Sequence, residues 1–229
     1  MEVVVASPHC PPGRDRATDS TGAPTGGTLP PPRRRDRQLG KGRIEAFSDG
    51  VIAIIITIMV LELRPPEGTT LEALRELGPV FVSYVLSFVF VGIYWNNHHH
   101  LFQAVRAVDG RVLWANLFLL FCLSLLPFAS AWMGEHEFAS VPVALYGVIL
   151  LAAAVAYFVL VRTLLPIQPE GTRLGEAIGN DAKGKISPLI YALAIPIALV
   201  VPAIAFAMYV AVAVIWVVPD TRIERTLSR

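Results

Sequence analysis

The sequence predicts an all-α membrane protein that crosses the bilayer six times. Hydrophobic residues make up 54% of the 229 residues and charged residues only 16%. The apolar residues form long blocks and do not recur with an amphipathic period. Such blocks are typical of membrane-spanning helices, each of which needs about 20 mostly apolar residues. The net charge is close to zero and says little about partners.

Residues 1–40 predict a disordered cytoplasmic tail. They are rich in Pro, Gly, Ser, Thr and Arg, and almost no apolar residue follows Val5. Such a segment cannot bury enough surface to offset its loss of conformational entropy. We therefore expect a six-span domain over residues 41–219, followed by a short basic cytoplasmic tail over residues 220–229.

Five apolar blocks follow the first tail. Four of them suit one helix each: 44–63, 78–104, 112–133 and 141–161. The fifth, 186–218, would form a helix of about 50 Å, well beyond a hydrocarbon core of about 30 Å. Because Pro196 and Pro202 interrupt this block, we predict two shorter helices that turn near Pro202.

Basic residues give the orientation, because Lys and Arg accumulate on the cytoplasmic side of short loops. They concentrate before the first block, after the second and after the fourth, whereas residues 134–137 (GEHE) contain none. The C-terminal segment carries three arginines and is also predicted inside. With both termini inside, the number of spans must be even, which favours six over five.

The first block carries a stripe of residues along one side. At 100° per residue, the stripe comprises Gly50, Ile54, Thr57, Ile58 and Leu61. The Thr57 hydroxyl can either donate to a carbonyl one turn back or face whatever the stripe faces.

Two acidic residues lie near the ends of the same block. Asp49 is costly at this depth without partners, so it either bonds to neighbouring helices or contacts an ion. Glu62 is either a solvated residue at the helix end or part of a ring that attracts cations.

A motif at the base of the first block resembles that of a known family. The motif, R-x-x-x-F-S-D-G, comprises Arg43, Phe47, Ser48, Asp49 and Gly50. An Ile-rich segment ending in VLEL follows it, and YWNNHHHLF lies further along the chain. This pattern resembles the transmembrane protein 175 family, the potassium channels of endosomes and lysosomes, which have bacterial relatives. The resemblance extends from Lys41 to about Val218.

The resemblance implies a potassium-permeable cation channel and not an enzyme. Its pore would form from first helices gathered around a central axis, without the TVGYG filter, which this sequence lacks. Only one copy of the motif is present, as in the single-repeat bacterial members. We therefore expect a homotetramer, multi-pass in the bacterial inner membrane, whose partners are potassium, other monovalent cations and the lipid bilayer. We expect no nucleic-acid partner.

The resemblance also implies roles for residues of the stripe. By position relative to Asp49, the hydrophobic constriction of the family matches Ile54, and further pore-lining positions match Ile58 and Leu61. A ring of four aliphatic side chains can close a pore by dewetting. The threonine layer of some bacterial members matches Thr57, so the resemblance favours a pore-lining role for this residue.

A second group is implied to hold the first helix in place. Arg43, Phe47, Ser48 and Asp49 would join a polar network with His98 and His99 of the second span. One histidine would reach the network while the others face the cytoplasmic interface. Because consecutive helical residues point about 100° apart, His98, His99 and His100 cannot converge on one metal. We expect no metal site and no cofactor.

Two other functions were weighed. A proton-coupled secondary transporter would relay protons between Asp49 and a histidine of the second span. Against it, the chain shows no paired half repeats with broken helices. An intramembrane enzyme using the histidines with Glu135 or Glu137 would need a nucleophile or metal constellation that the sequence does not show.

Overall fold

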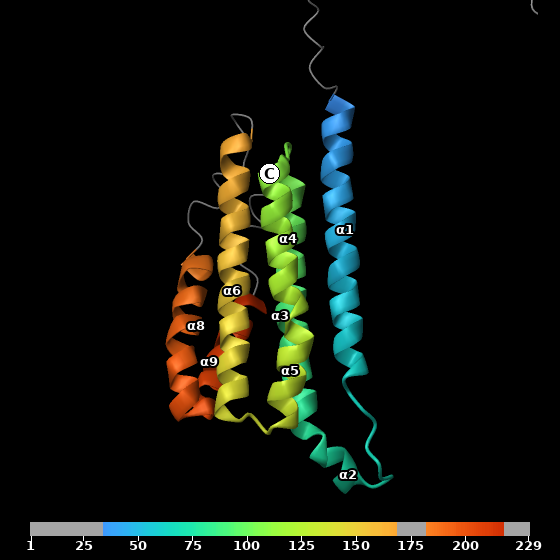
Figure 1. The fold of residues 1–229 in the computed structure, drawn as a ribbon, viewed down its shortest axis with the longest axis vertical. Coiled ribbons are helices and arrows are strands. Elements are labelled where there is room, and N and C mark those ends of the chain that lie inside the picture. The colour runs from blue at the N-terminus through green and yellow to red at the C-terminus, as the bar shows by residue number, and fades with distance from the viewer. Residues whose placement is uncertain (1–33, 169–181, 218–229) are drawn as a thin grey trace, which may run out of the picture. The chain divides into compact units, whose positions relative to one another are not determined.

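The computed structural model describes residues 34–168 and 182–217, without the side chains of residues 34–39 and 182–183. Every regular element in these ranges is helical (Figure 1). The elements are α1 (Arg34–Leu61), α2 (Leu71–Glu76), α3 (Gly78–Ala104), α4 (Gly110–Ser124), α5 (Leu126–Glu135), α6 (Ser140–Leu164), the 3-10 helix η1 (Leu165–Ile167), α8 (Ala182–Val200) and α9 (Pro202–Val217). The chain is therefore all-α over its described residues, as predicted.

The predicted tails lie almost entirely outside the described residues. Residues 220–229 and residues 1–33 are not described. α1 begins at Arg34, so its first turns up to Gly40 belong to the segment that we assigned to the N-terminal tail. The helix extends back to Arg34, and no proline separates its first turns from the apolar block.

The apolar helices agree with the predicted six-span fold. Four segments of the described chain are long and apolar enough to cross a membrane, at Gly40–Leu61, Gly78–Ala104, Gly110–Glu135 and Ser140–Ile167. The last apolar block supplies two shorter apolar helices, α8 and α9. Their division confirms the predicted turn near Pro202, because α9 begins at this proline. Proline fits the first turn of a helix, where its missing N–H needs no partner.

The third span is divided in a way that the sequence analysis did not predict. α4 ends at Ser124 and α5 begins at Leu126, with Pro127 in the first turn of α5. Pro127 has no N–H to donate to the preceding turn, so the helical hydrogen bonds are interrupted there. The Leu125 N–H instead donates to the Cys122 carbonyl at 3.3 Å.

The helices pack so that α1 keeps one side uncovered by the described chain. α6 packs against α4, α5, α8 and α9, whereas α1 packs mainly against α3, α4 and α5. Figure 1 shows α1 beside α3–α5, on the side away from α8 and α9.

Candidate ion-conduction helix

α1 has a buried face and an exposed face. The buried residues follow one another at intervals of three and four positions and comprise Ile44, Ser48, Ile52, Ile55 and Met59. They pack against α3, α4 and α5. The large exposed residues include Phe47, Ile54, Ile58 and Leu61, with Ile54 exposed by 57% and Leu61 by 76%. A helix with this pattern is bound to its own bundle along one side only.

All residues of the predicted stripe lie outside the buried face. Gly50, Ile54, Thr57, Ile58 and Leu61 are each exposed in the single chain. An uncovered apolar face of a membrane helix can meet lipid, a second copy or a pore. The pore-lining role of these residues therefore stays a prediction.

The Thr57 hydroxyl makes the backbone contact that we weighed as an alternative. Its Oγ1 donates to the Ile54 carbonyl at 2.9 Å. A hydroxyl that donates a hydrogen bond keeps oxygen lone pairs, which can accept another hydrogen bond or contact a cation. Because the side chain is exposed, this bond is compatible with a second contact outside the chain.

A groove of about 590 Å³ runs along α1 beside α5. Its walls are mostly apolar and include Val51, Ile54, Ile55 and Ile58 of α1 with Pro127, Phe128, Ala131 and Trp132 of α5. Glu62, Arg64 and Glu135 border it at the end where α1 and α5 finish. The candidate gate residues Ile54 and Ile58 therefore lie between the groove and the uncovered side of α1.

A buried chain of hydrogen bonds ties α1 to α4 and α3. Asn116 Nδ2 donates to Ser48 Oγ at 2.9 Å, and Ser48 Oγ donates to the Ile44 carbonyl at 2.8 Å. His98 Nε2 lies 2.8 Å from Asn116 Oδ1. Because the Asn116 amide nitrogen donates to Ser48, its oxygen accepts, so His98 Nε2 is the donor.

His98 is 1% exposed, and its ring stacks on Phe102 with the ring centroids 4.4 Å apart. Its other nitrogen, Nδ1, has no hydrogen-bond partner among the described residues. His98 is therefore the histidine that reaches Ser48, through Asn116, and its ring is fixed by packing as well as by this bond.

Two further contacts join the base of α1 to α3. Trp95 Nε1 donates to Asp49 Oδ1 at 3.0 Å. His99 Nδ1 lies 3.4 Å from Glu45 Oε1, and its other nitrogen lies 2.8 Å from Gln103 Nε2. Asp49 thus has the interhelical partner that its depth requires.

The structure links Ser48 to His98 and places Asp49 and His99 beside them. Arg43 and Phe47 are not part of this network. Both side chains are exposed, and neither makes a hydrogen bond or ring contact within the described part of the chain. His100 is also exposed, with its ring centroid 5.7 Å from that of His99.

Trp95, Asn116 and Glu45 were missed by the sequence analysis. A signal existed for each. Asn116 is an amide inside an apolar block and Glu45 an acid at the base of one, and such residues need partners in a membrane. Trp95 lies one turn before His99 and stacks on it, so the two share the face that meets α1.

The described residues hold no group of three or more His, Cys, Asp or Glu side chains arranged to bind a metal.

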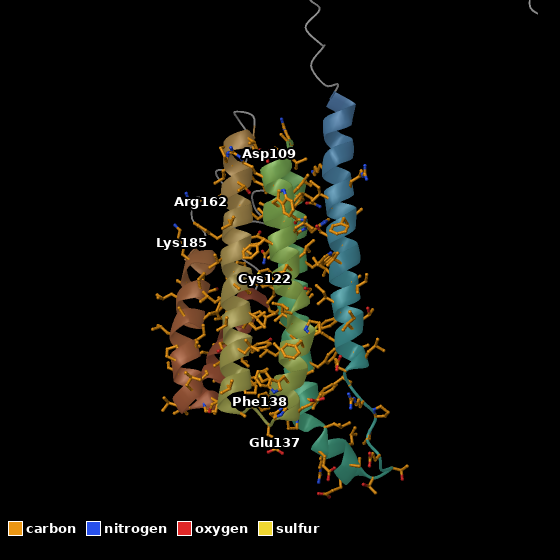
Figure 2. All side chains as sticks on the ribbon, viewed as in Figure 1. Asp109, Cys122, Glu137, Phe138, Arg162 and Lys185 are labelled. Atoms are coloured by element: carbon orange, nitrogen blue, oxygen red, sulfur yellow. The ribbon has the colours of Figure 1, made fainter. Side chains whose placement is uncertain are left out.

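Charged residues differ between the two ends of the helices. Arg106, Arg111, Arg162 and Lys185 lie at or beyond the ends near the start of α1, whereas Glu135 and Glu137 lie at the other end. Figure 2 shows Arg162 and Lys185 toward the first end and Glu137 at the second.

Known proteins resemble this chain in sequence and in fold. A family model described as the endosomal/lysosomal potassium channel TMEM175 matches residues 43–127, which contain every polar contact between α1 and its neighbours described above. A potassium channel of Chryseobacterium sp. (strain P1-3) is 52% identical over 82% of this chain and 98% of its own length. The endosomal/lysosomal proton channel TMEM175 of Gallus gallus is 39% identical over 40% of this chain, which spans only 21% of that relative.

A solved structure shares the fold. It is a crystal structure of a lysosomal potassium-selective channel TMEM175 homolog from Chamaesiphon minutus, with a TM-score of 0.70 and 28% identity. The match covers 79% of this chain and 97% of the other. The motif at the base of α1, the helical fold and the likeness to the bacterial channel along nearly its whole length lead to one conclusion: the chain belongs to the TMEM175 family.

Proposed function

We propose that the chain is one subunit of a potassium-permeable cation channel whose pore is lined by α1 of four copies. The observation that carries the proposal is the division of α1 into a held face and a free face. Ser48, Asp49 and the buried aliphatic residues bind α3–α5, and the aliphatic stripe is left uncovered. A pore wall needs this combination of fixed rotation and free surface.

In this proposal, the stripe closes the pore without a filter loop. Four Ile54 side chains would meet at the axis and exclude water, and Ile58 and Leu61 would extend the apolar wall toward the outer end. The Thr57 oxygen would replace part of the hydration shell of a passing cation, which gives a modest preference for potassium.

The charges at the two ends support an orientation and a direction of cation entry. Short cytoplasmic loops carry an excess of Lys and Arg, so the end with Arg162 and Lys185 is cytoplasmic, and both termini are inside. The opposite end, with Glu62, Glu135 and Glu137, would raise the local concentration of cations. The membrane would be the bacterial inner membrane, as for a bacterial member of the family.

A proton-coupled transporter fits the contacts less well. Its relay would pass between Asp49 and a histidine, but Asp49 accepts from Trp95 while His98 bonds to Asn116. Among the described residues no hydrogen bond joins Asp49 to a histidine. Since the Gallus gallus relative is named a proton channel, proton flux belongs in the test.

Flux through the purified protein in liposomes tests the proposal. With potassium inside and an impermeant cation outside, the channel should generate a membrane potential without any proton gradient. Empty liposomes give the background, and a potassium ionophore gives full release. Potassium movement that stops when the proton gradient is collapsed would instead establish coupled transport and contradict the channel.

A further inference from the structure

One side of α1 carries small residues whose size the single chain does not explain. Ala46, Gly50, Ala53 and Thr57 follow one another at intervals of four, three and four residues, so they share one side of the helix, and all are exposed. A Cβ atom added at Gly50 would meet nothing within 4 Å. Glycine inside a helix is less favourable than alanine, and a row of small exposed residues lets another helix approach closely.

A second uncovered surface of α1 is the groove that it forms with α5. Val51, Ile54 and Ile58 form its α1 wall, while Phe128 and Trp132 belong to the facing wall. Its volume of about 590 Å³ is that of an unfilled site and not of a packing defect. A helix side with small side chains lets its backbone approach another helix closely, so such a side can enter an apolar groove.

The angle between the two surfaces fits a ring of copies. At 100° per residue, the side with Gly50, Ala53 and Thr57 and the groove side with Ile54 and Ile58 lie roughly 90° apart around α1. In a square ring, each helix sees its two neighbours 90° apart. In such a ring, the direction halfway between the two surfaces points to the central axis. This direction passes near Leu61, so the predicted stripe faces the axis.

We propose that the small-residue side of α1 from one copy packs into the α1–α5 groove of the next copy. This head-to-tail contact closes after four copies. It rests on the proposed four-copy pore and names the surfaces that build it. No charged residue lies between Gly50 and Val60, and the charged residues of the groove, Glu62, Arg64 and Glu135, border it only at the end where α1 and α5 finish. Phe128 and Trp132 then support the neighbouring pore helix from behind.

Cross-linking between differently tagged copies tests the contact. In a background with Cys10 and Cys122 replaced by Ala, an Ala53→Cys chain with one tag is co-expressed with a Phe128→Cys chain with a second tag. α1 and α4–α5 run in the same direction (Figure 1), and the groove places residues 51–62 beside residues 124–135. Ala53 of one copy and Phe128 of the next are therefore at similar depth. Because each chain carries one cysteine, a disulfide joining the two tags can form only between copies.

The expected result is a disulfide-linked pair bearing both tags after mild oxidation in membranes. The matched control replaces Phe128→Cys with Val155→Cys, an exposed residue of α6, and should give no such pair. Absence of the Ala53–Phe128 pair, with phospholipid retained by the purified protein in native mass spectrometry, would show that lipid fills the groove and overturn the proposal. If the disulfide-linked pair forms but the protein shows no potassium flux, the contact is supported and the channel function is refuted. If potassium flux is present but the pair does not form, the channel function is supported and the contact is refuted.

A second variant keeps the test independent of cysteine chemistry. Gly50→Leu has free space in the single chain and replaces a poor helix former by a good one, so each copy should fold. It should lower the affinity between copies by about tenfold or more, because the added side chain overfills the contact. Ala192→Leu, at an exposed position of α8, should leave assembly unchanged. Equal assembly of Gly50→Leu and the parent chain, measured by mass photometry in detergent, would also overturn the proposal.

Discussion

Two adjacent side chains near the middle of α1 fix which way the helix faces. Ser48 and Asp49 point about 100° apart and bond to different helices, Ser48 to Asn116 of α4 and Asp49 to Trp95 of α3. Rotation of α1 would break at least one of these bonds. The Asn116–Ser48 bond is buried, whereas the Trp95–Asp49 bond is exposed.

Trp95→Phe should weaken this attachment while keeping the ring. It removes the Nε1 donor and leaves the Asp49 side chain without its 3.0 Å bond, so we expect a loss of about 0.5–1.5 kcal/mol in the free energy of unfolding. Thermal unfolding of the purified protein in detergent measures it. Trp114→Phe, at a 75% exposed position of α4, is the matched control. An equal change in both variants would show that the Asp49 bond contributes nothing specific.

Thr57→Val should change ion selectivity more than conductance. The valine has nearly the same shape but cannot approach a cation with an oxygen. The potassium-over-sodium permeability ratio should therefore fall about two- to fivefold, equivalent to ~0.5–1 kcal/mol. The reversal potential in mixed potassium and sodium solutions gives this ratio. If it does not move, the Thr57 hydroxyl serves only the Ile54 carbonyl.

At this scale, the sequence predicted the polar residues but not all of their partners. Ser48, Asp49, His98 and His99 were expected in one network, and they lie at the interface of α1 with α3 and α4. Their partners come from other helices whose rotation depends on packing across the whole bundle. A single sequence therefore indicates that Asp49 needs a donor, but does not identify Trp95 as that donor.

The elements owe their boundaries largely to proline. Pro202 begins α9, as predicted, because its restricted φ angle suits the first turn. Pro127 divides the third span into α4 and α5, whereas Pro188 and Pro196 remain inside α8. The effect of a proline on a helix depends on the neighbouring elements. The sequence therefore predicted the helix boundary at Pro202 but not the division of the third span at Pro127.

Close approach of α6 and α9 depends on one glycine. Tyr209 of α9 donates from its hydroxyl to the Val143 carbonyl of α6 at 3.2 Å, and a Cβ atom at Gly147 would overlap the Tyr209 hydroxyl. Both residues are buried in the apolar interior, where the Tyr209 side chain has little room to move.

Gly147→Ala should therefore destabilise the bundle by about 1–3 kcal/mol, the usual effect of overfilling a packed core. The matched control is Gly92→Ala in α3, where an added Cβ meets nothing within 4 Å and alanine is the better helix former. Thermal unfolding in detergent compares the two. Equal stability of Gly147→Ala and Gly92→Ala would mean that α9 does not approach α6 as closely as the structure shows.

In the whole molecule, basic residues predominate at the end near the start of α1, together with Asp109, and acidic residues predominate at the other end, together with Arg64 and Arg75. In a four-copy ring, the acidic groups at the outer end of each α1 would surround the pore mouth. Glu62 directly follows α1 and borders the groove, so among the carboxylates of the outer end it is the closest along the chain to the proposed pore wall.

Glu62→Gln should lower potassium conductance by about twofold at low ionic strength and have little effect at high salt, because salt screens the attraction of cations to the mouth. Single-channel recording at two potassium concentrations measures the difference. Glu76→Gln in α2 alters an equally charged, exposed residue farther along the chain from α1 and should change conductance less. A reduction that persists unchanged at high salt would exclude electrostatic attraction as its cause.

The central proposal is that the stripe of α1 faces a conducting pore. Leu61→Cys and Val60→Cys occupy the same depth near the outer end of α1 and are both exposed in the single chain, but only Leu61 belongs to the stripe. With the native cysteines replaced by Ala, a charged, membrane-impermeant thiol reagent is added from the outer side while potassium current is recorded. If the stripe faces the pore, the reagent should rapidly block the Leu61→Cys current and have little effect on the Val60→Cys current. Block of Val60→Cys with Leu61→Cys unaffected would contradict this proposal.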